Sequence, residues 1–208
     1  MAAQGTNATA GEPHDANGAV DLGGVLLARH GETDDNLVPR FQGWRDTPLN
    51  ATGRRQAFEL GRRLAERASA GEEPVASLWA SDLSRARDTA EIVGAALGLR
   101  PLLDWRLREG ARGRWEGLLM EEVERAEPEL YAAWMHDDPS FRFPGGEMLR
   151  EQQQRVLAAL HDIHARGPLP ALVVCHGGSI QVMLALRDPR GLRAFHSFHV
   201  ANTAVHAL

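Results

Sequence analysis

The sequence contains no lysine, since all 23 of its basic residues are arginine. Mechanisms that require a lysine, such as a Walker-type phosphate loop or a pyridoxal Schiff base, are therefore excluded. Cysteine occurs once, as Cys175. A single cysteine can form neither an internal disulfide nor a thiolate cluster for zinc, and it fits a reducing compartment. We therefore expect a cytoplasmic protein.

Long apolar runs and an excess of positive charge are also missing. No apolar run is long enough to span a bilayer, and the net charge of −5 provides no basic surface for nucleic acid, so we expect neither as a partner. The 208 residues, 43% of them hydrophobic, suit one globular domain. Residues 1–21 are rich in Ala, Gly, Asn and Thr and predict a disordered leader, which assigns the domain to residues 22–208.

The most informative stretch is an apolar run that ends abruptly in polar residues. Residues 24–28 predict a short buried strand, and Arg29, His30 and Gly31 follow it directly. In an open α/β sheet, ligands gather where the strands end. Arginine offers a forked, permanently charged donor to phosphate oxygens, and a neutral imidazole can present a lone pair to phosphorus. The stretch therefore predicts phosphate chemistry at the end of a strand.

Two later stretches repeat this arrangement. After the apolar run 75–80, Ser81 or Asp82 is expected to cap a helix that carries Arg85 in its first turn. Backbone N–H groups favour anions at that position, so Arg85 could complete a phosphate clamp with Arg29. Residues 171–175 form the most strand-like run in the chain, and His176 follows them. His176 could contact a phosphate from the opposite side.

Helical periodicity predicts two long amphipathic helices, over residues 52–67 and 147–164. Between them, residues 118–143 concentrate bulky apolar side chains, which suggests a helical cap. Most of these aromatics would pack the cap onto the body, and a few could line a pocket for an apolar leaving group.

Two pairs of histidines have the His-x-x-His spacing that metal ligands can show: His161 with His164, and His196 with His199. Neither has a carboxylate or third histidine convincingly placed beside it, so we expect no metal site. We also expect no cofactor.

Together the motifs resemble those of the histidine phosphatase superfamily, the phosphoglycerate mutase-like enzymes that pass through a phosphohistidine. The string Arg-His-Gly-Glu-Thr at residues 29–33 resembles the signature of that superfamily. The spacing Ser-x-Leu-x-Arg-Ala-x-x-Thr-Ala at residues 81–90 resembles its second motif, and the likeness extends over about residues 23–208. It implies an α/β fold, a three-layer α/β/α sandwich with a mostly parallel central sheet. A helical cap insertion at about residues 110–146 would lie over the C-terminal ends of the strands.

The resemblance also implies the roles of individual residues. Glu109 stands in a Leu-Arg-Glu triplet that Trp115-Glu116-Gly117 follows, as in the family, and is implied as the proton donor. The nucleophile would be His30. The implied phosphate-binding residues are Arg29, Asn36, Gln42, Gly43, Arg85, His176 and Gly177.

Three functions fit these motifs. The first is a broad-specificity phosphatase acting on a small-molecule phosphomonoester. The second is a mutase, but cofactor-dependent mutases follow the catalytic glutamate with Arg-His-Tyr-Gly, where this chain has Gly110-Ala111-Arg112-Gly113. Even so, Arg112 and Arg114 could hold a second anionic group. The third is a catalytically silent phosphate-binding module, although such proteins usually lose the histidine or the acid, and both are kept here. A homodimer is left open.

Overall fold

A five-stranded sheet forms the centre of the computed structural model, which describes residues 22–136, 138 and 140–208. The predicted leader lies outside the described residues. The strand order is β3-β2-β4-β1-β5; β5 runs antiparallel to β1, and the other neighbours are parallel. The strands are β1 (Val25–Arg29), β2 (Ser77–Ala80), β3 (Leu102–Leu103), β4 (Ala171–Cys175) and β5 (Val205–Ala207). The prediction of a mostly parallel sheet is confirmed.

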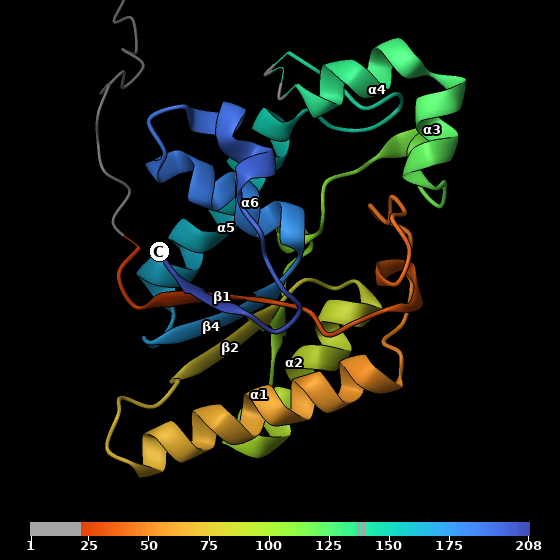
Figure 1. Cartoon of the computed structure of the whole chain (residues 1–208). Helices are drawn as coiled ribbons and strands as arrows, with labels where there is room; N and C mark the ends of the chain where they lie inside the picture. The colour runs from red at the N-terminus through yellow and green to blue at the C-terminus, as the bar shows by residue number, and fades with distance from the viewer. Residues whose placement is uncertain (1–21, 137, 139) are drawn as a thin grey trace, which may run out of the picture.

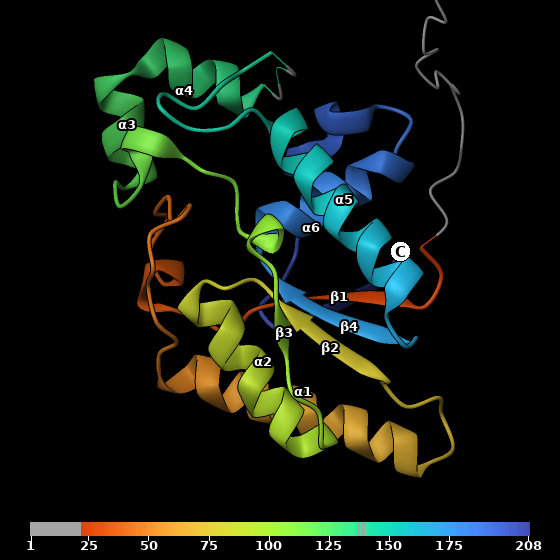
Figure 2. The same cartoon turned by 180° about the vertical axis from the view of Figure 1, so that it is seen from behind.

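Helices cover both faces of the sheet (Figures 1 and 2). Alternate residues of β4 point to opposite sides, as the period of a strand requires. Leu172 and Val174 pack among residues of α1 (Ala51–Ser69) and α2 (Ser84–Leu97). Val173 and Cys175 pack among residues of α5 (Leu149–Arg166) and α6 (Gly177–Leu184). The predicted three-layer sandwich is therefore confirmed. No helix in the described part of the chain has the length and apolar character to cross a bilayer.

The cap contains α3 (Met120–Ala126) and α4 (Pro128–Met135), which lie beyond the strand ends in Figure 1. An aromatic cluster holds it against the loop that follows β1. Within the cluster the ring centroids of Phe41 and Trp134 lie 5.0 Å apart, and those of Phe41 and Trp115 lie 5.1 Å apart. The buried members are Phe41, Trp115, Val123, Trp134, Phe141 and Phe143. Most aromatics of this region therefore serve packing, as the sequence suggested.

Short 3-10 helices fill the connections. They are η1 (Asp34–Asn36), η2 (Trp105–Leu107), η3 (Gly113–Trp115), η4 (Ala185–Arg187) and η5 (Gly191–Ser197).

The start of α2 differs from the prediction. The helix begins at Ser84, and neither Ser81 nor Asp82 caps it, because the N-cap position belongs to Leu83, whose side chain makes no capping bond. Instead the backbone N–H of Ser84 donates to Oδ1 of Asp46 at 2.7 Å. The cap comes from the loop between β1 and α1, some forty residues earlier, so local sequence could not reveal it.

The same loop is fastened to the start of α1. Asn50 accepts the N–H of Gly53 at 2.8 Å and donates to the carboxylate of Glu32 at 2.9 Å. Gly31 lies so close to α1 that an added Cβ would collide with the carbonyl oxygen of Gly53. Only glycine fits such an approach. The residue after His30 is thereby fixed against the first helix.

Candidate active site

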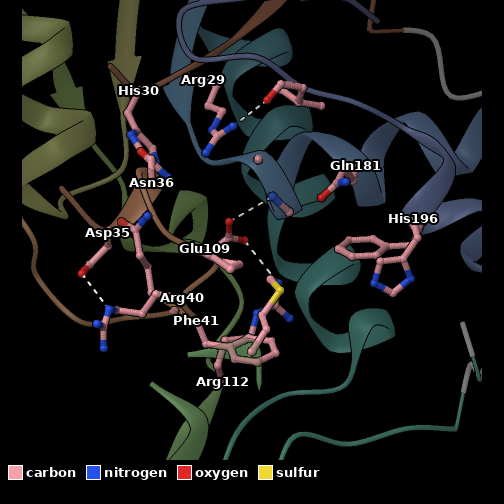
Figure 3. Close-up of a pocket in the computed structure, with 18 of the residues that line it drawn as sticks. Arg29, His30, Asp35, Asn36, Arg40, Phe41, Glu109, Arg112, Gln181 and His196 are labelled. Atoms are coloured by element: carbon pink, nitrogen blue, oxygen red, sulfur yellow. Dashed lines mark hydrogen bonds and ion pairs between the residues drawn. The ribbon is translucent and has the colours of Figure 1, made fainter. Parts of the chain in front are cut away.

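His30 and His176 meet because the strands before them are neighbours. β1 and β4 pair in parallel with Arg29 opposite Cys175, so both chains leave the sheet at the same edge. The two imidazole rings have centroids 5.2 Å apart, and both side chains are buried. A cavity of about 360 Å³ opens there, with His30, Arg29 and Glu109 in its wall (Figure 3). Arg85 also lines it. The structure therefore brings together side chains that are far apart in the sequence.

His30 is held in one tautomer. Its Nδ1 lies 2.7 Å from the carbonyl oxygen of Gly31, which can only accept, so Nδ1 carries the proton. Nε2 accepts no hydrogen bond from any residue that the structure describes. Burial, together with the charges of Arg85 and Arg29, lowers the pKa of His30 well below its usual value. The ring is therefore neutral near pH 7 and keeps a free lone pair on Nε2.

Arg85, in the first turn of α2, is completely buried and oriented by three contacts. Its Nε donates to Nδ1 of His176 at 3.2 Å, and its terminal nitrogens donate to the carbonyl oxygens of Arg45 and Gly43, each at 2.8 Å. Burial lowers the pKa of Arg85 to about 10, so the guanidinium stays charged at neutral pH.

His176 uses both ring nitrogens within the protein. Because Nδ1 accepts from Arg85, Nε2 carries the proton and donates to Oγ of Ser81 at 2.8 Å. Burial is the main cause that lowers the pKa of His176 well below its usual value, followed by the charge of Arg85. In this arrangement His176 positions Arg85, and its direct contact with a phosphate stays a prediction.

Arg29 also lies in the cavity wall. One terminal nitrogen donates to the carbonyl oxygen of Val200 at 2.7 Å. Nε is buried and has no partner among the described residues. An added Cβ on Gly177, at the start of α6, would stand 3.5 Å from that nitrogen. Glycine there keeps the approach to Arg29 open.

Glu109 is an acceptor on every side. Its Oε1 accepts from the N–H of Gly110 and from Nε2 of Gln152, both at 2.9 Å, and its Oε2 accepts from the N–H of Gly178 at 3.0 Å. Burial would raise the pKa of Glu109, but the charge of Arg112 and the N–H groups of Gly110 and Gly178 outweigh it and lower the pKa. Glu109 is therefore a carboxylate at neutral pH.

Asn36 and Gln42 both line the cavity and both use their carbonyl oxygen locally. Oδ1 of Asn36 accepts the N–H of Thr33 at 3.0 Å, and Oε1 of Gln42 accepts from Oγ1 of Thr33 at 3.2 Å. Their amide nitrogens donate to no described residue. Gly43 contributes its backbone, since its carbonyl oxygen holds Arg85 and an added Cβ would collide with Glu116.

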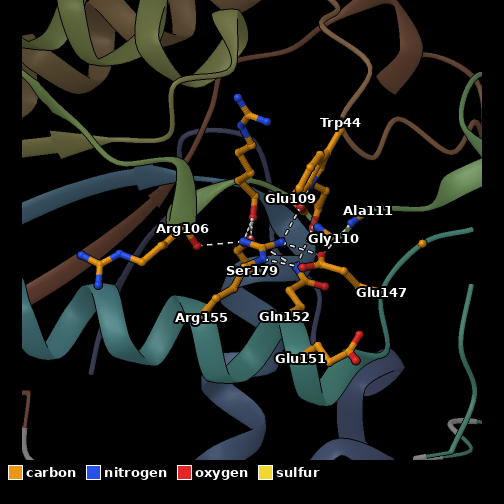
Figure 4. A network of polar contacts seen from close by, with 12 residues as sticks. Trp44, Arg106, Glu109, Gly110, Ala111, Glu147, Glu151, Gln152, Arg155 and Ser179 are labelled. Carbon is orange, nitrogen blue, oxygen red and sulfur yellow. Dashed lines mark hydrogen bonds and ion pairs between the residues drawn. The ribbon is translucent and has the colours of Figure 1, made fainter.

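One arginine of α5 anchors the segment that carries Glu109 (Figure 4). Arg155 donates to the carbonyl oxygens of Arg106, Arg108 and Glu109 at 2.7–2.8 Å. The same guanidinium pairs with the carboxylate of Glu147 at 2.7 and 2.8 Å. The backbone around the carboxylate is therefore tied to a long helix of the core.

Sequence reasoning did not find Gln152, Asp46 or Arg155. Gln152 is fully buried and stands four residues before Val156, within the apolar stripe of α5. A polar residue in such a stripe is the signal that could have revealed it. Arg112 reaches the cavity, whereas Arg114 lies outside it and pairs with Glu127. Among the described residues, no three histidine, cysteine, aspartate or glutamate side chains form a candidate metal site.

Comparison with known proteins gives consistent results. Residues 25–208 match the sequence model of the histidine phosphatase superfamily, branch 1. The chain is 38% identical over 173 residues to phosphoglycerate mutase-like protein 4 of Arabidopsis thaliana, which covers 82% of this chain and 73% of that protein. It is 35% identical over 169 residues to a glucosyl-3-phosphoglycerate phosphatase of Mycolicibacterium vanbaalenii. This match covers 77% of this chain and 72% of that protein.

Solved structures agree with the sequence matches. A mycobacterial glucosyl-3-phosphoglycerate phosphatase superposes with a TM-score of 0.75 at 29% identity and 87% coverage of each chain. The YhfR protein of Bacillus stearothermophilus superposes with a TM-score of 0.76 at 33% identity, covering 87% of this chain and 88% of that one.

Proposed function

The chain belongs to the histidine phosphatase superfamily and hydrolyses phosphomonoesters, and we propose that it does so through a covalent phosphohistidine on His30, without a metal ion. The observation that carries the proposal is the state of His30. Its proton is fixed toward Gly31 by a 2.7 Å contact, while Nε2 is unpaired among the described residues and shares the cavity with Arg29 and Arg85. Such an imidazole can attack phosphorus without first losing a proton.

In the first step, Nε2 of His30 forms a bond to phosphorus as the bond from phosphorus to the ester oxygen breaks. Glu109 gives a proton to the departing oxygen, because an alkoxide is a poor leaving group until it is protonated. In the second step, water forms a bond to phosphorus as the bond from phosphorus to Nε2 of His30 breaks, gives its proton to the carboxylate of Glu109, and inorganic phosphate is released. Since Glu109 is ionised before substrate binds, it must take up a proton as the complex forms.

Charge neutralisation in this scheme comes from the protein itself. Arg29 and Arg85 both face the cavity, and the N-terminus of α6 begins beside them at Gly177. Two guanidinium groups and the N–H groups at the start of a helix can stabilise the charge on the phosphoryl group in the transition state of its transfer. These groups support the proposal that no metal ion takes part.

Trapping the intermediate tests the proposal. Acid-labile, alkali-stable phosphate should appear on His30 when the enzyme is mixed with a fast phosphomonoester such as p-nitrophenyl phosphate and quenched with alkali. His30→Ala should lose that label and roughly 10³-fold or more of kcat, and EDTA should leave the wild-type rate unchanged. His161→Ala is the matched control, because His161 lies exposed on α5. Full activity of His30→Ala, or a label on another residue, would contradict the proposal.

Phosphotransfer of the mutase type is the second candidate, and the names of several relatives favour it. The observation in this chain is Arg112, a buried arginine that lies in the cavity wall together with Arg29 and Arg85. Incubation with 3-phosphoglycerate separates the two reactions, since a mutase returns the 2-phosphate isomer and a phosphatase releases inorganic phosphate.

A further inference from the structure

Arg112 is buried without the hydrogen bonds that a buried guanidinium needs. Only 7% of the residue is exposed. Its side chain donates no hydrogen bond to any residue that the structure describes. The nearest charge is Oε1 of Glu109, at 3.6 Å from a terminal nitrogen, which is too long for a hydrogen bond. The ring of Phe143 lies 4.4 Å from the guanidinium carbon.

Two other arginines of this region, the buried Arg85 and the partly buried Arg155, contrast with Arg112. Arg85 makes three hydrogen bonds and Arg155 makes five. An arginine carries five N–H donors, and none of those on the side chain of Arg112 is paired with a described residue. The donors of Arg112 therefore remain available to an acceptor that is not part of the described chain.

The surroundings leave room for that acceptor. An added Cβ on Gly178 would come within 2.8 Å of one terminal nitrogen of Arg112, and one on Gly110 within 2.8 Å of the other. Both glycines thus keep the guanidinium uncovered. Arg112 lines the same cavity as His30 and Arg85 (Figure 3). A cavity of about 360 Å³ is larger than a phosphoryl group requires, so it can also hold the alcohol portion of a substrate.

The position of Arg112 assigns it to the leaving-group side. Arg29 and Arg85 lie close enough to His30, which attacks phosphorus, for their charges to lower its pKa, whereas Arg112 lies beside Glu109, which protonates the ester oxygen. A group bound by Arg112 would therefore belong to the alcohol, a few atoms beyond that oxygen.

We propose that Arg112 is a specificity-determining residue that binds an oxyanion, a carboxylate or a second phosphate, carried by the alcohol portion of the substrate. Binding of that group would draw Arg112 away from Glu109 and free the carboxyl group to act as proton donor. The inference rests on the proposed phosphatase mechanism, because it assigns the leaving group to the side of Glu109.

The electrostatics of the free site agree with this coupling. Burial raises the pKa of Glu109, and Arg112 is the largest of the causes that lower it. Once a substrate oxyanion neutralises Arg112, the largest of the causes that lower the pKa of Glu109 is removed, so the pKa rises and uptake of a proton from solvent becomes easier. That proton then moves to the ester oxygen as the bond to phosphorus breaks. A substrate without the oxyanion leaves Glu109 ionised and reacts more slowly.

A matched pair of substrates tests the inference. 3-Phosphoglycerate and glycerol 3-phosphate differ only in a carboxylate against a hydroxymethyl group. The wild-type enzyme should prefer 3-phosphoglycerate in kcat/KM by roughly 10- to 100-fold, the range of a charge-assisted hydrogen bond. Glycerol 1,3-bisphosphate, which carries a second phosphate instead, shows whether that oxyanion serves as well. Preference for either anion supports the proposal, and preference for neither overturns it.

Variants distinguish the contribution of Arg112 to this preference from that of the other positive charges of the site. Arg112→Met should lower the preference for 3-phosphoglycerate by roughly 10-fold or more, which leaves only the contribution of the other arginines. Arg112→Lys should keep part of this preference. Arg112→Met should also shift the alkaline limb of kcat/KM for glycerol 3-phosphate to higher pH, because the pKa of Glu109 rises. Arg114→Met is the control, since Arg114 is exposed and pairs with Glu127 outside the cavity.

Failure of this inference is distinguishable from failure of the mechanism. If the phosphohistidine forms on His30 but Arg112→Met keeps both the preference and the pH limb of the wild type, only the role of Arg112 is lost. If Arg112→Met does not fold, the preference of the wild type and the response of Arg112→Lys still decide. Absence of the phosphohistidine would instead remove the mechanism on which the inference rests.

Discussion

Two neutral imidazoles lie side by side at the strand ends, yet their neighbours give them different capabilities. His30 uses one nitrogen on the carbonyl of Gly31, and His176 uses both, on Arg85 and Ser81. Only His30 therefore keeps a lone pair for phosphorus. The difference lies in what surrounds each ring, since the rings are equally buried and follow equivalent strands.

The role of Glu109 depends on how good the leaving group is. Glu109→Gln should lower kcat on an alkyl phosphate such as 3-phosphoglycerate by roughly 10²- to 10⁴-fold, the usual contribution of a general acid. The loss should be much smaller on p-nitrophenyl phosphate, whose leaving group needs little protonation. Steady-state kinetics on both substrates measure the contrast. Equal losses on the two esters would show that Glu109 does not protonate the leaving group.

At the residue scale, sequence reasoning reached the groups that directly follow strands. Arg29, His30 and His176 were found because an apolar run ended before them. Glu109 came only from family resemblance, since no local pattern distinguishes it from neighbouring glutamates. Gln152, which holds Glu109 at 2.9 Å, was missed because its role exists only after α5 packs against residues forty positions earlier.

At the scale of elements, the loop before α1 caps the helix that carries Arg85. Asp46 caps α2 and therefore links the loop, the helix and the phosphate clamp. Asp46→Ala should lower the free energy of unfolding by about 1 kcal/mol, as loss of a helix cap does. The same variant should lower kcat/KM by roughly 10-fold through displacement of Arg85.

Chemical denaturation and steady-state kinetics measure both effects of the Asp46 substitution. Asp46→Asn serves as the matched control, because its side-chain oxygen can still accept the N–H of Ser84. If Asp46→Ala and Asp46→Asn behave alike, the capping contact has no part in placing Arg85.

Elements were predicted well where their pattern is local. Residues 171–175 were identified as a strand without error, and α1 and α5 differ from the predicted helices by a few residues at their ends. The helix predicted from residue 147 begins at Leu149, because the backbone of Met148 is extended and its N–H donates to the carboxylate of Glu151. The ends of helices depend on such contacts, and periodicity alone does not contain them.

For the molecule as a whole, the buried histidines make stability depend on pH. Burial lowers the pKa of both His30 and His176 in the fold, whereas each takes up a proton near pH 6.5 in the unfolded chain. Their neutral forms therefore favour the fold fully above pH 6.5, and this contribution is lost as the pH falls below that value. Each histidine should reduce the free energy of unfolding by up to about 1.4 kcal/mol per pH unit.

Urea denaturation between pH 7.5 and pH 5.5 measures this dependence before most carboxylates titrate. His30→Gln should flatten the curve below pH 6.5, whereas His161→Gln, at an exposed position on α5, should not change its slope. A wild-type stability that is constant over this interval would contradict the neutral state of the two rings in the fold.

The order of layers was predictable because family resemblance and apolar strands agreed on it. The register of the sheet was not, since only tertiary pairing sets Arg29 opposite Cys175. That register decides whether the two imidazoles meet. The feature of the fold that matters most for the site could therefore not be predicted from the sequence.

The guanidinium of Arg155 has a consequence for the timing of catalysis. By joining three carbonyl groups of one short segment to a core helix, it fixes the position of Glu109 when the chain folds and not when the substrate arrives. A ligand that enters this cavity meets a carboxyl group whose backbone is already in position. Binding therefore costs no conformational entropy of that segment.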